Sequence, residues 1–163
     1  MSVFKSLSEE HFLLLNLVGR LDRAADAKDA RNLLLVLLKA LEAHENLEHL
    51  VFDRESTASG ETGVALVLIE RQHHALGELR EEASQLLRNL GREEDAAVRG
   101  LSRRLACLLR RHFEDEERTL WPRFNAVAGR SRLQRLDRVA RAQVKAMKKE
   151  LDDYRIAVED YLT

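Results

Sequence analysis

Residues 32–52 read NLLLVLLKALEAHENLEHLVF, and this stretch decides the fold. Its leucines recur at spacings of three and four, which is the period of a helix that buries one stripe. At about 100° per residue, Glu45 and Glu48 point in nearly the same direction as Leu34, and His44 flanks them. A carboxylate on a buried stripe costs several kcal/mol unless a cation or a proton neutralises it. The stretch therefore predicts a bundle helix with a polar site in its core.

Four more stretches repeat this period, so we expect an all-α protein. Proline occurs once and aromatic residues are few, which lets helices run long. The first helix is expected to begin at Ser6 or Ser8, and the others are expected at about 29–52, 61–90, 93–121 and 131–161. Short connections favour antiparallel neighbours. The predicted fold is an up-down-up-down antiparallel four-helix bundle with an additional C-terminal helix.

Capping and breaking residues predict the helix boundaries. Asp29 or Asn32 is expected to open the second helix, and the turn residues 56–60 separate it from the third. Gly91 is expected to stop the third helix, and Pro122 lies at the predicted end of the fourth.

The length of the chain, 163 residues, suits one bundle with an appended element. We expect the bundle to occupy 1–126 and an amphipathic C-terminal helix to occupy 131–163. This helix is expected to pack on the bundle or on a partner. A homodimer through its apolar stripe is one such arrangement.

Charge and composition exclude several classes of function. The 27 basic and 28 acidic residues are interspersed and leave a net charge of -1, so no surface field would gather nucleic acid or an anionic membrane. The sequence has no apolar leader and no apolar run of membrane-spanning length. The one cysteine, Cys107, rules out an intramolecular disulfide. We therefore expect a soluble, cytoplasmic protein.

Ionisable residues also lie on the apolar stripes of the other three bundle helices. His11 lies within about 40° of the mean direction of the first stripe. On the fourth helix, His112 and Glu116 lie within about 20° of a stripe leucine. On the third, His73 lies about 70° from the stripe and His74 about 170°, so His73 is the ligand candidate and His74 faces solvent.

These residues have the pattern of a metal site. A histidine followed by a glutamate four residues later places both side chains on one face of a helix. Two such pairs on facing helices supply two carboxylates that can bridge two ions. Nitrogen and oxygen ligands without thiolate suit iron or manganese better than a closed structural zinc site. Glu45 could complete the second ion's coordination, because the third helix has one inward histidine. The candidate metal ligands are His11, His44, Glu45, Glu48, His73, His112 and Glu116.

With this ordered pattern the chain resembles the hemerythrin-like, or HHE cation-binding, family. The resemblance covers about 7–124, and the phrase HFEDEERTLWPRF at 112–124 is similar to the family's fourth-helix ending. It implies a four-helix bundle with two non-haem iron ions, bridged by two glutamates and an oxo or hydroxo group. Such a centre binds dioxygen or responds to iron, oxygen or nitric oxide. Oxygen-carrying hemerythrins have two histidines four apart on the third helix. This chain has Gly77 four residues after His73, and so resembles the single-histidine branch, whose members often bind a carboxylate instead.

Three functions are compatible with these residues. The favoured one is a binding or sensing protein without turnover, whose partners are metal ions and a small diatomic ligand. The sequence has no nucleophile, phosphate loop or acid–base pair outside the cluster, which argues against an enzyme. The second is a di-iron enzyme for peroxide removal or iron-centre repair. The third is a metal-free helical interaction module, since a lone His-x-x-x-Glu is usually a surface pair. His49, beyond its stripe, is interpreted as a surface residue or one that supports a ligand.

Overall fold

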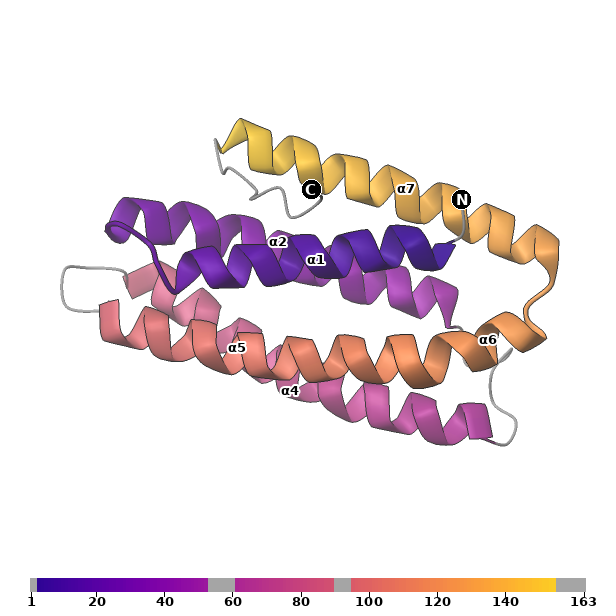
Figure 1. The fold of residues 1–163 in the computed structure, drawn as a ribbon. Helices are drawn as coiled ribbons and strands as arrows, with labels where there is room; N and C mark the ends of the chain where they lie inside the picture. Colours follow the sequence, from indigo (N-terminus) through magenta and orange to yellow (C-terminus); the bar gives the residue numbers. More distant parts are fainter. Residues whose placement is uncertain (1–2, 53–60, 90–94, 155–163) are drawn as a thin grey trace.

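The computed structural model of the chain describes residues 3–52, 61–89 and 95–154, and the regular structure in these ranges is helical. The helices are α1 (Val3–Leu21), α2 (Ala27–Val51), α4 (Glu61–Asn89), α5 (Asp95–Asp115), α6 (Trp121–Val127) and α7 (Arg130–Asp153). Figure 1 shows α1, α2, α4 and α5 as an antiparallel bundle, with α7 lying across α1 and α2. The prediction of an all-α bundle with an additional C-terminal helix is confirmed. Among the described helices, none has the length and apolarity needed to cross a lipid bilayer.

The first two helices begin earlier than predicted. α1 already includes Val3, so the predicted start at Ser6 or Ser8 is wrong. Val3 is fully buried and extends the apolar stripe, which keeps this turn helical. α2 is capped by Asp26 instead of either predicted residue, because the Asp26 carboxylate accepts a hydrogen bond from the backbone N–H of Asp29 at 2.8 Å. The predicted turn at 56–60, the predicted stop at Gly91 and the end of the last predicted helix lie outside the described residues.

The fourth bundle helix does not end at Pro122. Residues Glu116–Leu120 form a single π-helical turn, in which the backbone N–H of Trp121 donates to the carbonyl of Glu116. Pro122 has no N–H, and its ring would crowd the carbonyl of Arg118 in an α-helix. The wider turn accommodates one extra residue and relieves this crowding. The chain therefore stays helical to the end of α6.

Two apolar clusters fill the bundle and leave a polar layer between them. The larger cluster includes Leu14, Leu37, Leu76, Leu105 and Met147. The smaller cluster includes Leu7, Leu47, Ile69, Trp121 and Phe124. On α1, for example, His11 lies between the two clusters. Since neighbouring helices are antiparallel, the ionisable residues of all four bundle helices come to the same level.

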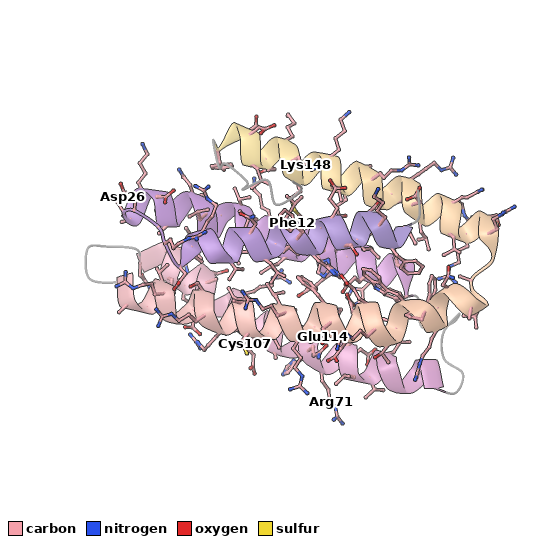
Figure 2. The ribbon with its side chains drawn as sticks, in the orientation of Figure 1. Phe12, Asp26, Arg71, Cys107, Glu114 and Lys148 are labelled. Carbon is pink, nitrogen blue, oxygen red and sulfur yellow. The ribbon has the colours of Figure 1, made fainter. Side chains whose placement is uncertain are left out.

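α7 covers the face formed by α1 and α2. Its buried residues Leu136, Ala140, Val144, Met147 and Leu151 recur at spacings of three and four. At the edges, Lys148 pairs with Glu9 of α1, and Lys39 of α2 pairs with Glu150 at 3.0 Å. The apolar stripe that suggested a partner is thus occupied within the chain, and a homodimer stays a prediction. On the opposite side of the bundle, Cys107 lies on the outer surface of α5 (Figure 2).

Candidate metal centre

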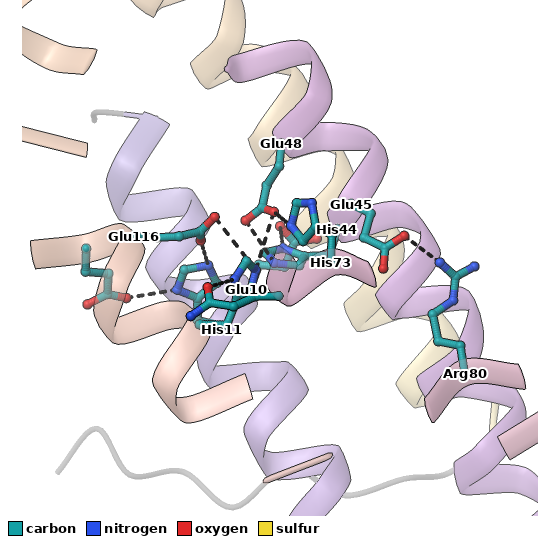
Figure 3. Close-up of polar contacts among 11 residues, drawn as sticks. Glu10, His11, His44, Glu45, Glu48, His73, Arg80 and Glu116 are labelled. Carbon is teal, nitrogen blue, oxygen red and sulfur yellow. Dashed lines mark hydrogen bonds and ion pairs between the residues drawn. The ribbon is translucent and has the colours of Figure 1, made fainter. Parts of the chain in front are cut away.

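Six ionisable side chains from the four bundle helices converge in the polar layer (Figure 3). They form two groups, in each of which the candidate ligand atoms lie within 4.8 Å of one another. The first group is His11, His44, Glu48 and Glu116. The second group is Glu48, His73, His112 and Glu116. Glu48 and Glu116 belong to both groups and link them.

Among the described residues, most of the atoms that face this centre find no hydrogen-bond partner. They are the buried Nε2 atoms of His11, His44 and His112, Oε1 of Glu48, and both carboxylate oxygens of Glu116. His44 Nε2 approaches Glu48 Oε1 to 3.0 Å, but as an ion-pair contact outside hydrogen-bond geometry. Each buried polar atom without a partner costs about 1–3 kcal/mol. Nitrogen and oxygen atoms that converge in this way fit metal ions, which would bind all of them at once.

Carboxylates outside the centre orient the histidines of the first group. His11 Nδ1 lies 2.9 Å from Glu117 Oε1. His44 Nδ1 lies 3.4 Å from Oε2 of Glu10, a fully buried residue of α1. The other oxygen of Glu10 accepts a hydrogen bond from Gln143 Nε2 of α7 at 2.6 Å. Because a carboxylate only accepts, each Nδ1 carries the proton, and Nε2 is left to face the centre.

In the second group, a side-chain amide orients a histidine as the carboxylates do in the first. Gln72 Nε2 donates to Asp115 Oδ2 at 2.6 Å, which sets the orientation of the amide. Gln72 Oε1 then accepts from His112 Nδ1 at 3.1 Å. His73 Nε2 lies 2.7 Å from Glu48 Oε2. The four histidines thus direct Nε2 toward the centre, as metal-binding histidines do.

The two shared carboxylates have opposite proton affinities in the metal-free protein. Burial and the negative charge of Glu48 raise the pKa of Glu116 well above its ordinary value. Burial would also raise the pKa of Glu48, but the positive charge of His44 holds it well below the usual range. Burial would lower the pKa of His44, yet Glu48 and Glu10 raise it to about 10. Burial lowers the pKa of His11 to about 4. Protons therefore balance the charge of the centre where metal would otherwise do so.

A protein-family model for the hemerythrin HHE cation binding domain matches residues 64–162. The chain belongs to this family. The predicted resemblance is therefore confirmed, and the buried histidine and glutamate groups of this HHE domain are able to hold metal. The match includes His73, His112 and Glu116, whereas the ligand candidates of α1 and α2 precede it and reach the centre through the fold. Comparison with curated proteins and with solved structures gave no match.

Three other residues that the sequence analysis predicted or weighed as ligands lie outside both groups. Glu45 Oε2 pairs with Arg80 Nη1 at 2.5 Å, and Glu45 Oε1 is buried without a hydrogen-bond partner. His74 is 84% exposed, in line with its outward direction on the helix. His49 is exposed, and its ring meets that of His73 edge-on with 5.8 Å between centroids.

Three polar residues beside the ligands are absent from the predicted set. Glu10 lies at stripe spacing from Leu7 and Leu14, and Gln72 has the same relation to its apolar neighbours on α4, so helical phase alone could have found both. Glu117 carries no such signal. It reaches His11 from within the π-helical turn, where the regular rotation of about 100° per residue no longer predicts the direction of a side chain.

A pocket of about 330 Å³ opens between α2 and α4 beside the second group. Glu48 and His73 line it, together with the apolar residues Phe52, Leu66 and Ile69. His73 is 13% exposed, whereas the other three histidines of the centre are at most 3% exposed. The second group is thus the part of the centre that the surface reaches.

Proposed function

We propose that the chain binds two iron ions as a non-haem di-iron centre. Each group holds one ion, and Glu48 and Glu116 bridge the two. The observation that carries this proposal is that the groups share two carboxylates, as a bridged pair of ions requires. The unpartnered atoms of the layer support it, because bound ions would engage all of them, whereas the contacts of the metal-free protein leave them unsatisfied.

The donor set favours iron with open coordination positions. Each ion receives two histidine nitrogens and two carboxylate oxygens from the chain, and no thiolate. Such ligands suit iron or manganese, and four of them leave room in an octahedral shell. When bound, the ion pair supplies a site for a small diatomic ligand. We therefore propose that the protein binds or senses iron, dioxygen or nitric oxide without catalytic turnover.

Metal analysis is the direct test. Protein purified from iron-replete cells is expected to contain two iron ions per chain, and His74→Ala, which alters an exposed histidine, is the matched control. His44→Ala and His112→Ala should each lose one ion preferentially, because each belongs to one group. Protein that holds no transition metal and takes up no ferrous iron under anaerobic conditions would contradict the proposal.

Glu45 is proposed as an additional ligand of the second ion. In the part of the chain that the structure describes, its Oε1 has no hydrogen-bond partner, and its other oxygen pairs with Arg80. A turn of this side chain would supply the ligand that a second histidine on the third helix provides in other members. Glu45→Gln is expected to weaken the binding of one ion, whereas Glu42→Gln, at an exposed position of the same helix, should leave both unchanged. Equal affinities in the two variants would remove Glu45 from the ligand set.

A di-iron enzyme, for peroxide removal or iron-centre repair, is the second candidate, and the pocket beside His73 favours it. An enzyme needs a cavity that admits a substrate to the metal, and this pocket lies against the second group. Peroxide consumption by the iron-loaded protein, compared with the metal-free protein, distinguishes turnover from binding. A metal-free interaction module is the third candidate, and the metal analysis tests it.

A further inference from the structure

The two groups of the centre differ in their access to solvent. Phe113 stacks on the ring of His11 at 3.8 Å, and Trp121 covers another side of it at 5.2 Å. His44 is fully buried behind Glu10, which α7 holds through Gln143. Aromatic rings and a whole helix therefore close the first group.

The second group lies beside a pocket that opens to the surface. The pocket between α2 and α4 reaches Glu48 and His73 directly. Four other pockets along the described surface are lined by none of the six residues that form the two groups. Within the described residues, these pockets give an exogenous molecule a route to the place that an ion at His73 would occupy, and none of them reaches His11.

The walls of this pocket define the chemistry of its occupant. Phe52 and Ile69 are buried members of the smaller apolar cluster, and Leu66 packs against that cluster. Glu70 and His49 are the other polar residues of the lining. About 330 Å³ is roughly ten times the share of one water molecule in the liquid. The space is therefore larger than a diatomic ligand needs and lies at the lower end of the range for small-molecule sites.

We infer that this pocket binds a small organic molecule with an apolar body and one hydroxyl group, whose oxygen reaches the ion at His73. The apolar body lies against Phe52, Leu66 and Ile69, and the donor atom points toward Glu48 and His73. His49, which lines the pocket and meets His73 edge-on, can donate a hydrogen bond to the bound oxygen. This inference rests on the proposed function, since it places the ligand on one of two bound ions.

The first test needs no metal. Diethyl pyrocarbonate, which modifies accessible histidines, should react with His73 in the metal-free protein and spare His11 and His44. Leu66→Trp fills the pocket and should slow the reaction of His73 about tenfold, while Val67→Trp, at a neighbouring position that is 50% exposed, should not. Equal reactivity of His11 and His73, or no effect of Leu66→Trp, overturns the inference.

The second test uses the iron-loaded protein and phenol as the probe. Phenol should bind with a visible charge-transfer band as its oxygen coordinates ferric iron and its hydroxyl proton passes to the buffer. Leu66→Trp should weaken this binding about tenfold or more, at unchanged iron content, and Val67→Trp should not. Leu66→Phe, a smaller filling, should give an intermediate loss and serves if the tryptophan variant does not fold. Iron-free protein would contradict the proposed function. Full iron content with the same phenol affinity in wild type and Leu66→Trp would contradict only the pocket.

Discussion

Glutamine substitutions at the two shared carboxylates should change the stability of the metal-free protein in opposite directions. Glu116 is fully buried, and burial together with the charge of Glu48 raises its pKa well above its ordinary value. As the pH rises above the ordinary pKa of a glutamate, the folded protein therefore keeps a proton on Glu116 that the unfolded chain has already released. Glutamine has the shape of the protonated acid, so Glu116→Gln should raise the free energy of unfolding. Glu48→Gln should lower it, because it leaves the charged His44 without its nearest buried partner.

The sign and the limit of the Glu116 effect follow from proton linkage. A raised folded pKa contributes stability that is fully present below the unfolded value, 4.5, and is lost as the pH rises toward the folded value. The loss is about 1.4 kcal/mol per pH unit over the 2.5 units between 4.5 and 7, so it cannot exceed about 3.5 kcal/mol at pH 7. Glu116→Gln should recover up to that amount at pH 7 and less than about 1 kcal/mol at pH 5. For Glu48→Gln we expect a loss of about 3 kcal/mol, as when one partner of a buried ion pair is removed.

Urea unfolding of chelator-treated protein, followed by circular dichroism at pH 5, 6 and 7, measures both effects. Glu114→Gln is the matched control, because this neighbouring carboxylate is 53% exposed and should change stability by less than about 0.5 kcal/mol. A Glu116→Gln protein that is no more stable than wild type at pH 7 would refute the reasoning. So would a gain that is equally large at pH 5, since the effect would then not come from the proton.

The remaining predictions concern the ligands and the metal. His73→Ala should lose most of one ion while His74→Ala keeps both, by elemental analysis; the reverse result would mean that the phase assigned to the third helix is wrong. Removing the metal should lower the melting temperature at neutral pH, because the ions bind the folded state only. Calorimetry of the stripped protein should then show recovery as the pH falls from 8 toward 6.5, since the raised pKa values of His44 and Glu116 both add stability in that direction. Below 6.5 the gain from His44 is complete, and the lowered pKa values of His11, to about 4, and of His112 oppose the gain that remains from Glu116, so the recovery should level off. Identical melting curves with and without metal would contradict the second prediction.

Helical phase predicted the convergence of the candidate ligands because it depends only on spacing within one helix. His11, His44 and His112 lie on or beside apolar stripes, and antiparallel packing then brings those stripes to one level. Glu45 lies within about 20° of its stripe by the same arithmetic. Its actual partner, Arg80, belongs to another helix, and the distance between two side chains on different helices cannot be read from either phase alone.

Local irregularities set the other limit on prediction. A proline inside a helix usually ends it, but the π-helical turn before Pro122 lets the helix continue past this residue. That turn also carries Glu117 to His11, although an even α-helical phase would direct it to solvent. The start of α1 depended on the burial of Val3, which is a property of the packed bundle and not of the serines that follow it.

The polar layer between the two apolar clusters has a consequence for the cooperativity of folding. Without metal the layer contributes little favourable packing, so the smaller cluster is joined to the larger one mainly by the helices that run through both. Amides of α6, at the far side of the layer, can then exchange by a partial opening that leaves the larger cluster folded. Bound ions would link all four bundle helices at the polar layer. Hydrogen exchange of the α6 amides would then require global unfolding. Metal occupancy would thus set the size of the cooperative unit, and the bundle would unfold as two parts when empty and as one when full.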